Sequence, residues 1–175
     1  MSLVSASAVV AVGLVGTAAA VAGAAAEDVP TDTNGGSIVE DFAYPGAAAI
    51  KAEQGITLIS GDGHIILVAC STPPTGDIGL LRVRTTDPIG PASSRVFCFK
   101  ILANTGYLKL ELPTVYEIRG DGLTSGAGHE VTATVATSEG VLPPVQCDPD
   151  GFTQVGEGIN PENDPTTLLE LKVTG

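Results

Sequence analysis

Apolar and polar residues alternate with a period of two through most of the chain after Ile56, and no other sequence feature constrains the fold as strongly. In the segment 107–112, leucine occupies every second position, and Lys109 and Glu111 lie between the leucines. Successive side chains of a strand point to opposite faces, so this pattern predicts a strand with one buried face. The same reasoning predicts further strands over 56–60, 64–70, 80–85, 95–102, 115–119, 129–136, 152–155 and 167–173.

Glycine, aspartate and proline separate these segments and predict the turns. Gly61-Asp62-Gly63 is expected to turn a hairpin between 56–60 and 64–70, and Gly120-Asp121-Gly122 is expected to form a second turn of the same type. About eight short strands with frequent turns are typical of an all-β, antiparallel β-sandwich. A small β-barrel is the alternative.

The segment 80–85 illustrates how a strand divides its side chains between two faces. Leu81 and Val83 alternate there with Arg82 and Arg84, which is the pattern of a strand.

The N-terminal part of the chain has a different composition. Residues 1–26 carry no charged side chain and end in Ala24-Ala25-Ala26, which predicts an export signal cleaved after Ala26. No Lys or Arg precedes the apolar run, so an uncleaved membrane anchor is the alternative. We expect a flexible lead-in over 27–40 and then a single β domain over 41–175. This domain is expected to contain one short helix over 47–54, which Gly55 ends. We therefore expect a secreted, extracellular protein.

The charge of the chain limits its partners. The formal net charge is -12, from 8 Lys+Arg against 20 Asp+Glu. Nucleic acids and anionic membrane surfaces are bound through positive patches, so we expect neither as a partner. An extracellular protein or a cell-wall ligand is the expected kind of partner.

Three cysteines are present, and an oxidising compartment predicts one disulfide with one cysteine left over. Cys70 ends one predicted strand and Cys98 lies within another, so these two are the predicted pair. The two pairings that use Cys147 stay open. Cys147 lies in a predicted loop, where it is expected to be free, blocked or bonded to another chain.

Motifs of catalysis and metal binding are incomplete. The chain has neither Gly-x-Ser-x-Gly nor Ser-x-x-Lys. Its two histidines, His64 and His129, follow turns, which favours solvent-facing positions at strand edges; with Asp62 and Asp121 they form the set of candidate binding residues.

Several acidic loops raise the question of a calcium site. The candidate metal ligands are Asp148 and Asp150, with Glu162 and Asp164 further along, but the spacing of a calcium loop is incomplete and ordinary acidic turns are favoured. No cofactor is expected. Arg119-Gly120-Asp121 matches a tripeptide read by adhesion receptors, on what we expect to be an exposed turn, and the composition of this tripeptide is common enough to arise by chance.

The order of these segments resembles that of secreted proteins of unknown function from high-GC Gram-positive bacteria. This resemblance implies secretion and a shared fold, without an activity, cofactor or site. It rests on the Cys70 and Cys98 pair and on Tyr44-Pro45-Gly46, Gln54-Gly55-Ile56, Gly61-Asp62-Gly63-His64-Ile65, Gly106-Tyr107-Leu108-Lys109-Leu110-Glu111-Leu112-Pro113 and Val155-Gly156-Glu157-Gly158.

Three classes of function follow from these observations. A non-catalytic module that binds an extracellular protein, a cell-wall component or an ion, or that has a role in the envelope, is favoured because no nucleophile with an orienting base is specified. The alternatives are a secreted hydrolase whose site is assembled in space and a secreted inhibitor that presents the long loop 139–165.

Overall fold

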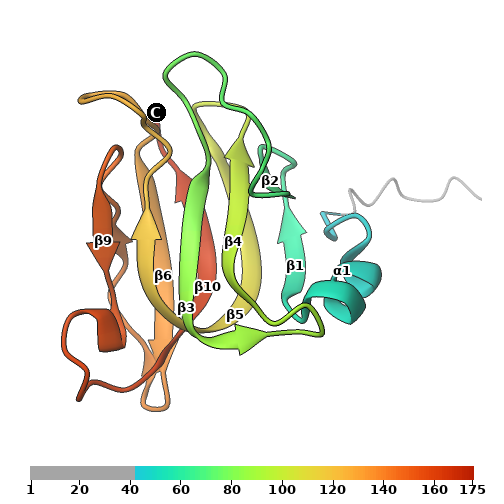
Figure 1. The fold of residues 1–175 in the computed structure, drawn as a ribbon, viewed down its shortest axis with the longest axis vertical. Helices are drawn as coiled ribbons and strands as arrows, with labels where there is room; N and C mark the ends of the chain where they lie inside the picture. The colour runs from blue at the N-terminus through green and yellow to red at the C-terminus, as the bar shows by residue number, and fades with distance from the viewer. Residues whose placement is uncertain (1–41) are drawn as a thin grey trace, which may run out of the picture. The chain divides into compact units, whose positions relative to one another are not determined.

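A computed structural model describes residues 42–175, and Figure 1 shows them as an antiparallel β-sheet fold with one short helix. The predicted export signal and lead-in, residues 1–40, lie outside the described residues. Within the described part no helix is long and apolar enough to cross a membrane. The elements are α1 (Ala47–Gln54), β1 (Thr57–Gly61), β2 (Ile65–Val68), β3 (Leu81–Ile89), β4 (Ser94–Ile101), β5 (Gly106–Arg119), β6 (Val131–Thr137), β7 (Gly140–Val141), β8 (Val145–Gln146), β9 (Phe152–Gln154), the 3-10 turn η1 (Gly156–Gly158) and β10 (Thr166–Val173).

The strands are hydrogen-bonded in the order β2-β4-β3-β5-β10-β6-β7, and β5 is the strand on which this arrangement depends. Its first half pairs with β1 and β10, whereas its last residues pair with β3 and β9. Between the two halves lies Thr114, whose φ of 52° is uncommon for a β-branched residue and marks an irregularity in the strand. A strand that bends in this way carries the chain from one layer of a sandwich to the other.

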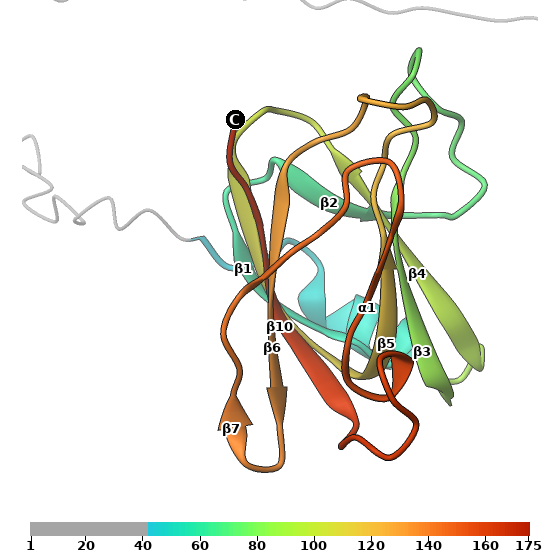
Figure 2. The ribbon, with the colours of Figure 1, turned by 90° about the vertical axis from the view of Figure 1, so that its left-hand side faces the viewer.

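Two layers result, and Figure 2 shows β3 and β4 on one side and β6 and β10 on the other. The all-β sandwich is therefore confirmed, and because the described strands do not close on one another, the barrel alternative is wrong. The inward side chains of both layers form one apolar core. Its largest fully buried members are Phe97, Phe99, Ile56, Leu58, Ile65, Leu81, Leu108, Leu110, Leu112, Ile118, Leu168 and Leu171.

The predicted helix is confirmed at 47–54, and Gly55 ends it in the left-handed conformation with φ 77°. Gly55 also lies directly against Gly90, in the turn between β3 and β4. A Cβ built on Gly55 would come within 2.5 Å of the Gly90 Cα, so both positions require glycine for the close approach of two backbones.

The two predicted hairpins are wrong, because the strands on either side of each turn do not pair with each other. The strands around Gly61-Asp62-Gly63 form, but β1 pairs with β5 and β2 pairs with β4, so no hairpin joins them. The chain crosses between layers there. Gly120-Asp121-Gly122 does not turn a hairpin either, because β5 and β6 both pair with β10 and not with each other.

The predicted strands over 107–112 and 115–119 are one strand, because β5 runs through Pro113 despite its missing N–H. The prediction of about eight strands falls short of the ten that form within residues 42–175, since β7 and β8 are only two residues long and lie in the segment expected to be loop. The short strand predicted near Phe152 is confirmed.

The predicted disulfide is confirmed: Cys70 and Cys98 are bonded, with their Cα atoms 5.1 Å apart. Cys147 is free and buried, with 2% of its surface exposed. A thiol at this depth cannot reach another chain while the domain is folded, so the interchain bond considered for Cys147 is not compatible with the native state.

Burial also raises the pKa of the Cys147 thiol from 9.0 to about 12, while a hydrogen bond with the backbone of Ala133 lowers it by a smaller amount. Below pH 9 the thiol is neutral in both folded and unfolded chains. As the pH rises from 9 towards 12, it ionises in the unfolded chain only, so its contribution to stability is lost. We expect this group to lower the free energy of unfolding by about 1.4 kcal/mol for each pH unit in that window.

Denaturant unfolding of the wild type and of Cys147→Ala, measured at several pH values between about 8 and 11, tests this expectation. Lysines and tyrosines titrate in both proteins, so the difference between the two pH slopes isolates Cys147. Parallel slopes would show that the thiol ionises equally well in the folded chain.

Candidate binding site

All four arginines of the chain lie on three neighbouring strands, although the protein is acidic overall. Arg82 and Arg84 belong to β3, Arg95 to β4 and Arg119 to β5. Leu81 and Val83 are fully buried, so Arg82 and Arg84, which alternate with them on β3, point away from the core.

Strand register places three of the four arginines, Arg82, Arg84 and Arg119, close together. Arg82 lies opposite Arg119, which in turn lies opposite Phe152 on β9. In the next row Arg84 lies opposite Glu117. Directly paired residues of an antiparallel ladder share a face of the sheet. We refer to the surface formed by Arg82, Arg84, Arg119 and Phe152, together with Arg95 in the groove that Arg84 also lines, as the arginine face.

Only one of these arginines is neutralised by a described acidic residue. Arg84 donates to the Glu117 carboxylate at 2.7 Å, and Gln154 donates to the other oxygen of that carboxylate at 2.8 Å. The Glu117 side chain is 11% exposed and that of Arg84 is 36% exposed, so the carboxylate is shielded more than the guanidinium, and the ion pair fixes the position of the Arg84 side chain.

Arg119 and Arg82 form no ion pair with a described acidic residue. Arg119 donates to the backbone carbonyls of Gly120 and Gly122. Arg82 is exposed and forms no side-chain hydrogen bond or ion pair with any described residue. The arginine face therefore carries positive charge that the folded domain does not neutralise.

Phe152 places an aromatic ring among these charges. Its ring centroid lies 5.7 Å from the guanidinium carbons of both Arg84 and Arg119, within the range of a cation–π interaction. Phe152 is nevertheless 54% exposed. An exposed phenylalanine held beside two guanidinium groups offers both apolar contact and charge, a combination that is common where proteins bind partners.

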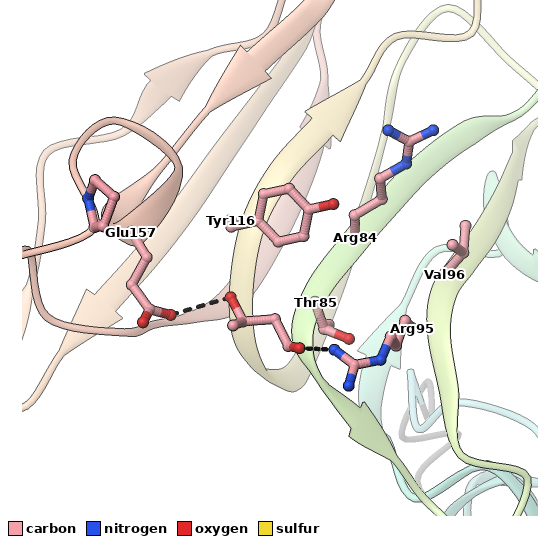
Figure 3. A pocket seen from close by; sticks show the side chains of 8 residues that line it. Arg84, Thr85, Arg95, Val96, Tyr116 and Glu157 are labelled. Carbon is pink, nitrogen blue, oxygen red and sulfur yellow. Dashed lines mark hydrogen bonds between the residues drawn. The ribbon is translucent and has the colours of Figure 1, made fainter.

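A groove of about 660 Å³ opens beside this surface, and Figure 3 shows the side chains around it. Its volume lies within the range of small-molecule sites, about 300 to 1,000 Å³. Strands β3, β4 and β5 and the η1 turn all contribute to its walls. The lining residues are Arg84, Thr85, Thr86, Arg95, Val96, Tyr116, Glu157 and Pro161.

Thr86 joins two opposite charges in this groove. Its backbone carbonyl accepts a hydrogen bond from Arg95, and its hydroxyl donates to Glu157 at 3.1 Å. Figure 3 shows Arg95 and Glu157 approaching from different elements. Neither forms an ion pair with a described residue. Tyr116 also lines the groove, and its hydroxyl makes no hydrogen bond within the described part of the chain.

The predicted binding residues form two separate pairs. His64 Nδ1 lies 2.8 Å from the carbonyl oxygen of Thr105 and 3.5 Å from Asp62, and it is exposed as expected. The Asp62 carboxylate accepts the backbone N–H groups of His64 and Tyr107. Asp62 therefore connects the crossover after β1 to the start of β5. His64 contacts Thr105 just before that strand, so both side chains have a structural role.

Asp121 and His129 form the second pair, and the structure corrects the expectation for both. Asp121 is fully buried, so the Arg119-Gly120-Asp121 tripeptide is not available to a receptor as an exposed turn. Its carboxylate accepts the backbone N–H of His129 at 2.8 Å and faces His129 Nδ1 at 2.7 Å. The His129 side chain is only 16% exposed, so it is not a solvent-facing residue at a strand edge.

This arrangement orients the imidazole, since a buried carboxylate favours a proton on Nδ1. Nε2 of the neutral ring is then an acceptor, and His129 lines grooves that also include Lys100 and Asn104. No described hydroxyl or thiol is hydrogen-bonded to Nε2, so the pair lacks the nucleophile contact of a catalytic triad. His64 does not line these grooves, and the two histidines are not brought together.

The candidate metal ligands Asp148 and Asp150 stabilise their own loop. Asp148 accepts the backbone N–H groups of Asp150 and Gly151, and Asp150 accepts that of Gly126. Among the described residues, no three His, Cys, Asp or Glu side chains are grouped closely enough to hold a metal ion. The loop geometry therefore supports acidic turns at these positions.

Comparison with known proteins adds no family. No protein-family model matches the chain, and no curated protein sequence matches it.

The arginine face was not identified from the sequence, although part of the signal was present. The alternation in 80–85 placed Arg82 and Arg84 on one face, but it could not show that β5 and β9 lie beside that face. Glu157 had no recognisable motif, and it enters the groove only through the fold of the η1 turn.

Proposed function

We propose that the domain is a non-catalytic extracellular binding module that holds a carboxylate-bearing ligand at the arginine face and its groove. The observation that carries this proposal is the gathering of all four arginines of an acidic chain on three neighbouring strands, where, among the described residues, Arg84 alone is paired with a carboxylate. Arginine donates to carboxylates through a planar fork of N–H groups, which makes it suited to this type of ligand.

An extracellular site of action is supported by two observations. The Cys70–Cys98 bond is of a kind that persists in oxidising compartments. The uncharged start of the sequence is typical of an export signal. Secretion would bring the arginine face into contact with extracellular proteins and cell-wall components, many of which carry carboxylates.

The remaining charge of the domain favours a small or local carboxylate over a long polyanion. The chain carries a net charge of -12, which repels an extended polyanion outside the immediate contact. Glu157 adds a negative charge within the groove itself. A ligand that places one carboxylate against Arg95 or Arg82 avoids both sources of repulsion.

The test uses two tetraalanine probes that differ only at the C-terminus: N-acetyl-tetraalanine with a free carboxylate, and the same peptide as its amide. Binding is measured from NMR chemical shifts of the purified protein at low salt. We expect the carboxylate probe to bind at least about tenfold more tightly than the amide, because a hydrogen bond to a charged group contributes about 1.5 to 3 kcal/mol. Arg95→Gln is expected to abolish most of that difference.

Lys109→Gln provides the matched control, because it removes one exposed positive charge from the first half of β5, outside the groove. It should leave the preference for the carboxylate unchanged. Equal binding of the two probes to the wild type, or an equal effect of the two substitutions, would contradict the proposal.

A further inference from the structure

We infer that the groove accepts a zwitterionic, peptide-like ligand, with its carboxylate at Arg95 and its ammonium group at Glu157. This inference rests on the proposed function and adds a second charged contact to it. It assigns a role to Glu157, which a site for anions alone would not require.

Thr86 holds both Arg95 and Glu157. Both side chains are hydrogen-bonded to this one residue, and they line the same groove. Within the described residues they form no ion pair with each other. Thr86 therefore holds a positive and a negative group at a set separation, where two free side chains of opposite charge would otherwise be drawn together.

Arg95 and Glu157 can both form further hydrogen bonds. A guanidinium group has five N–H donors, and Arg95 directs one of its nitrogens to the Thr86 carbonyl. A carboxylate has about four acceptor positions, and Glu157 receives one hydrogen bond from the Thr86 hydroxyl. Glu157 is also half-buried, so part of its hydration is lost and no cation among the described residues replaces it. An ammonium group would supply that cation.

The charge distribution then selects among ligand classes. A ligand with two negative groups would place one of them near Glu157, and a purely cationic ligand would meet Arg84 and Arg95. Each arrangement brings like charges together, which is unfavourable in a partly desolvated site. A ligand with a carboxylate at one end and an ammonium group at the other places each of its charges beside a residue of opposite charge, Arg95 or Glu157.

The uncharged lining indicates what lies between the two charged ends. Val96 and Pro161 are apolar, and Tyr116 combines an aromatic ring with a free hydroxyl. These groups suit a short chain with small aliphatic side chains and peptide bonds, to which the tyrosine hydroxyl can donate or accept a hydrogen bond. A short peptide with free termini has these properties.

The experiment compares three tetraalanine probes: the free peptide, its N-acetyl form and its C-terminal amide. Binding is measured by NMR chemical shifts for the wild type, Glu157→Gln and Arg95→Gln. In the wild type we expect the free peptide to bind about tenfold more tightly than either blocked form, one charged contact being lost in each case. Glu157→Gln should remove the preference for a free N-terminus and keep the preference for a free C-terminus, and Arg95→Gln should do the reverse.

The outcomes separate this inference from the proposed function. If the free and N-acetyl peptides bind equally and Glu157→Gln changes neither affinity, the inference is wrong while a carboxylate site remains. If neither probe with a free carboxylate binds better than the amide, the carboxylate site is wrong and the inference fails with it. Glu170→Gln, on β10 and outside the groove, is the charge-matched control and should leave all three affinities unchanged.

Discussion

His129→Ala is expected to lower the free energy of unfolding by about 3 kcal/mol, the upper end of the cost of leaving a buried acceptor without a hydrogen-bond partner, because the acceptor is a carboxylate. The carboxylate of Asp121 is fully buried, and His129 supplies both its backbone N–H and its ring nitrogen. Alanine keeps the backbone donor but removes the ring. The carboxylate is then left in the interior with half of its hydrogen bonding.

Asp121→Asn is the matched comparison. The asparagine oxygen can accept the backbone N–H, and its amide can donate to Nδ1 of the other imidazole tautomer, so both hydrogen bonds survive without the charge. We expect a smaller loss for this variant than for His129→Ala. Urea denaturation followed by circular dichroism measures both, and a loss below about 1 kcal/mol for His129→Ala would contradict the account.

Removing the disulfide by the double substitution Cys70→Ser and Cys98→Ser is expected to destabilise the domain by about 3 to 4 kcal/mol. The bond closes a segment with a sequence separation of 28 residues, and this segment includes β3, which contributes two arginines to the arginine face. The larger conformational freedom of the unfolded chain is the main reason for the loss in the chain-entropy account.

Urea unfolding of the double variant and of the wild type, each with and without a reductant, tests this prediction. Reduction should lower the stability of the wild type to that of the variant and should leave the variant unchanged. Cys147 is present in both proteins and is buried, so it does not distinguish them. Cys147 is the one cysteine left in the double variant, so a reductant effect that persists there would indicate a bond between the Cys147 residues of two chains and would contradict this account.

The fold class followed from the sequence because its causes are local. Alternation of apolar residues, the glycine at the end of α1 and the β-branched segments each act within a few residues. The strand that became β5 was predicted as two pieces because proline normally interrupts a sheet. Pro113 lies where β5 passes from its pairing with β1, a ladder that ends at Glu111, to its pairing with β3, a ladder that begins at Val115, so its missing N–H falls between two ladders.

The site was harder to predict because it depends on contacts between distant segments. The two glycine-rich turns were assigned to hairpins by their composition, although Asp121 is held by His129 and Asp62 by the start of β5. The net charge of -12 likewise gave no indication that the four arginines lie on neighbouring strands. A net charge describes no particular surface, and the grouping of Arg82 with Arg119 follows from strand order alone.

The bend in β5 has a consequence for how the domain responds to occupancy. One strand belongs to both layers, so neither layer can melt while the other stays folded, and we expect unfolding to be a single cooperative event. A ligand that binds only the folded state raises its stability in proportion to the logarithm of ligand concentration. Binding beside Tyr116 at one end of β5 therefore raises the melting temperature of β6 and β10 in the opposite layer, and a thermal shift of the whole domain reports a ligand whose contacts are confined to one face.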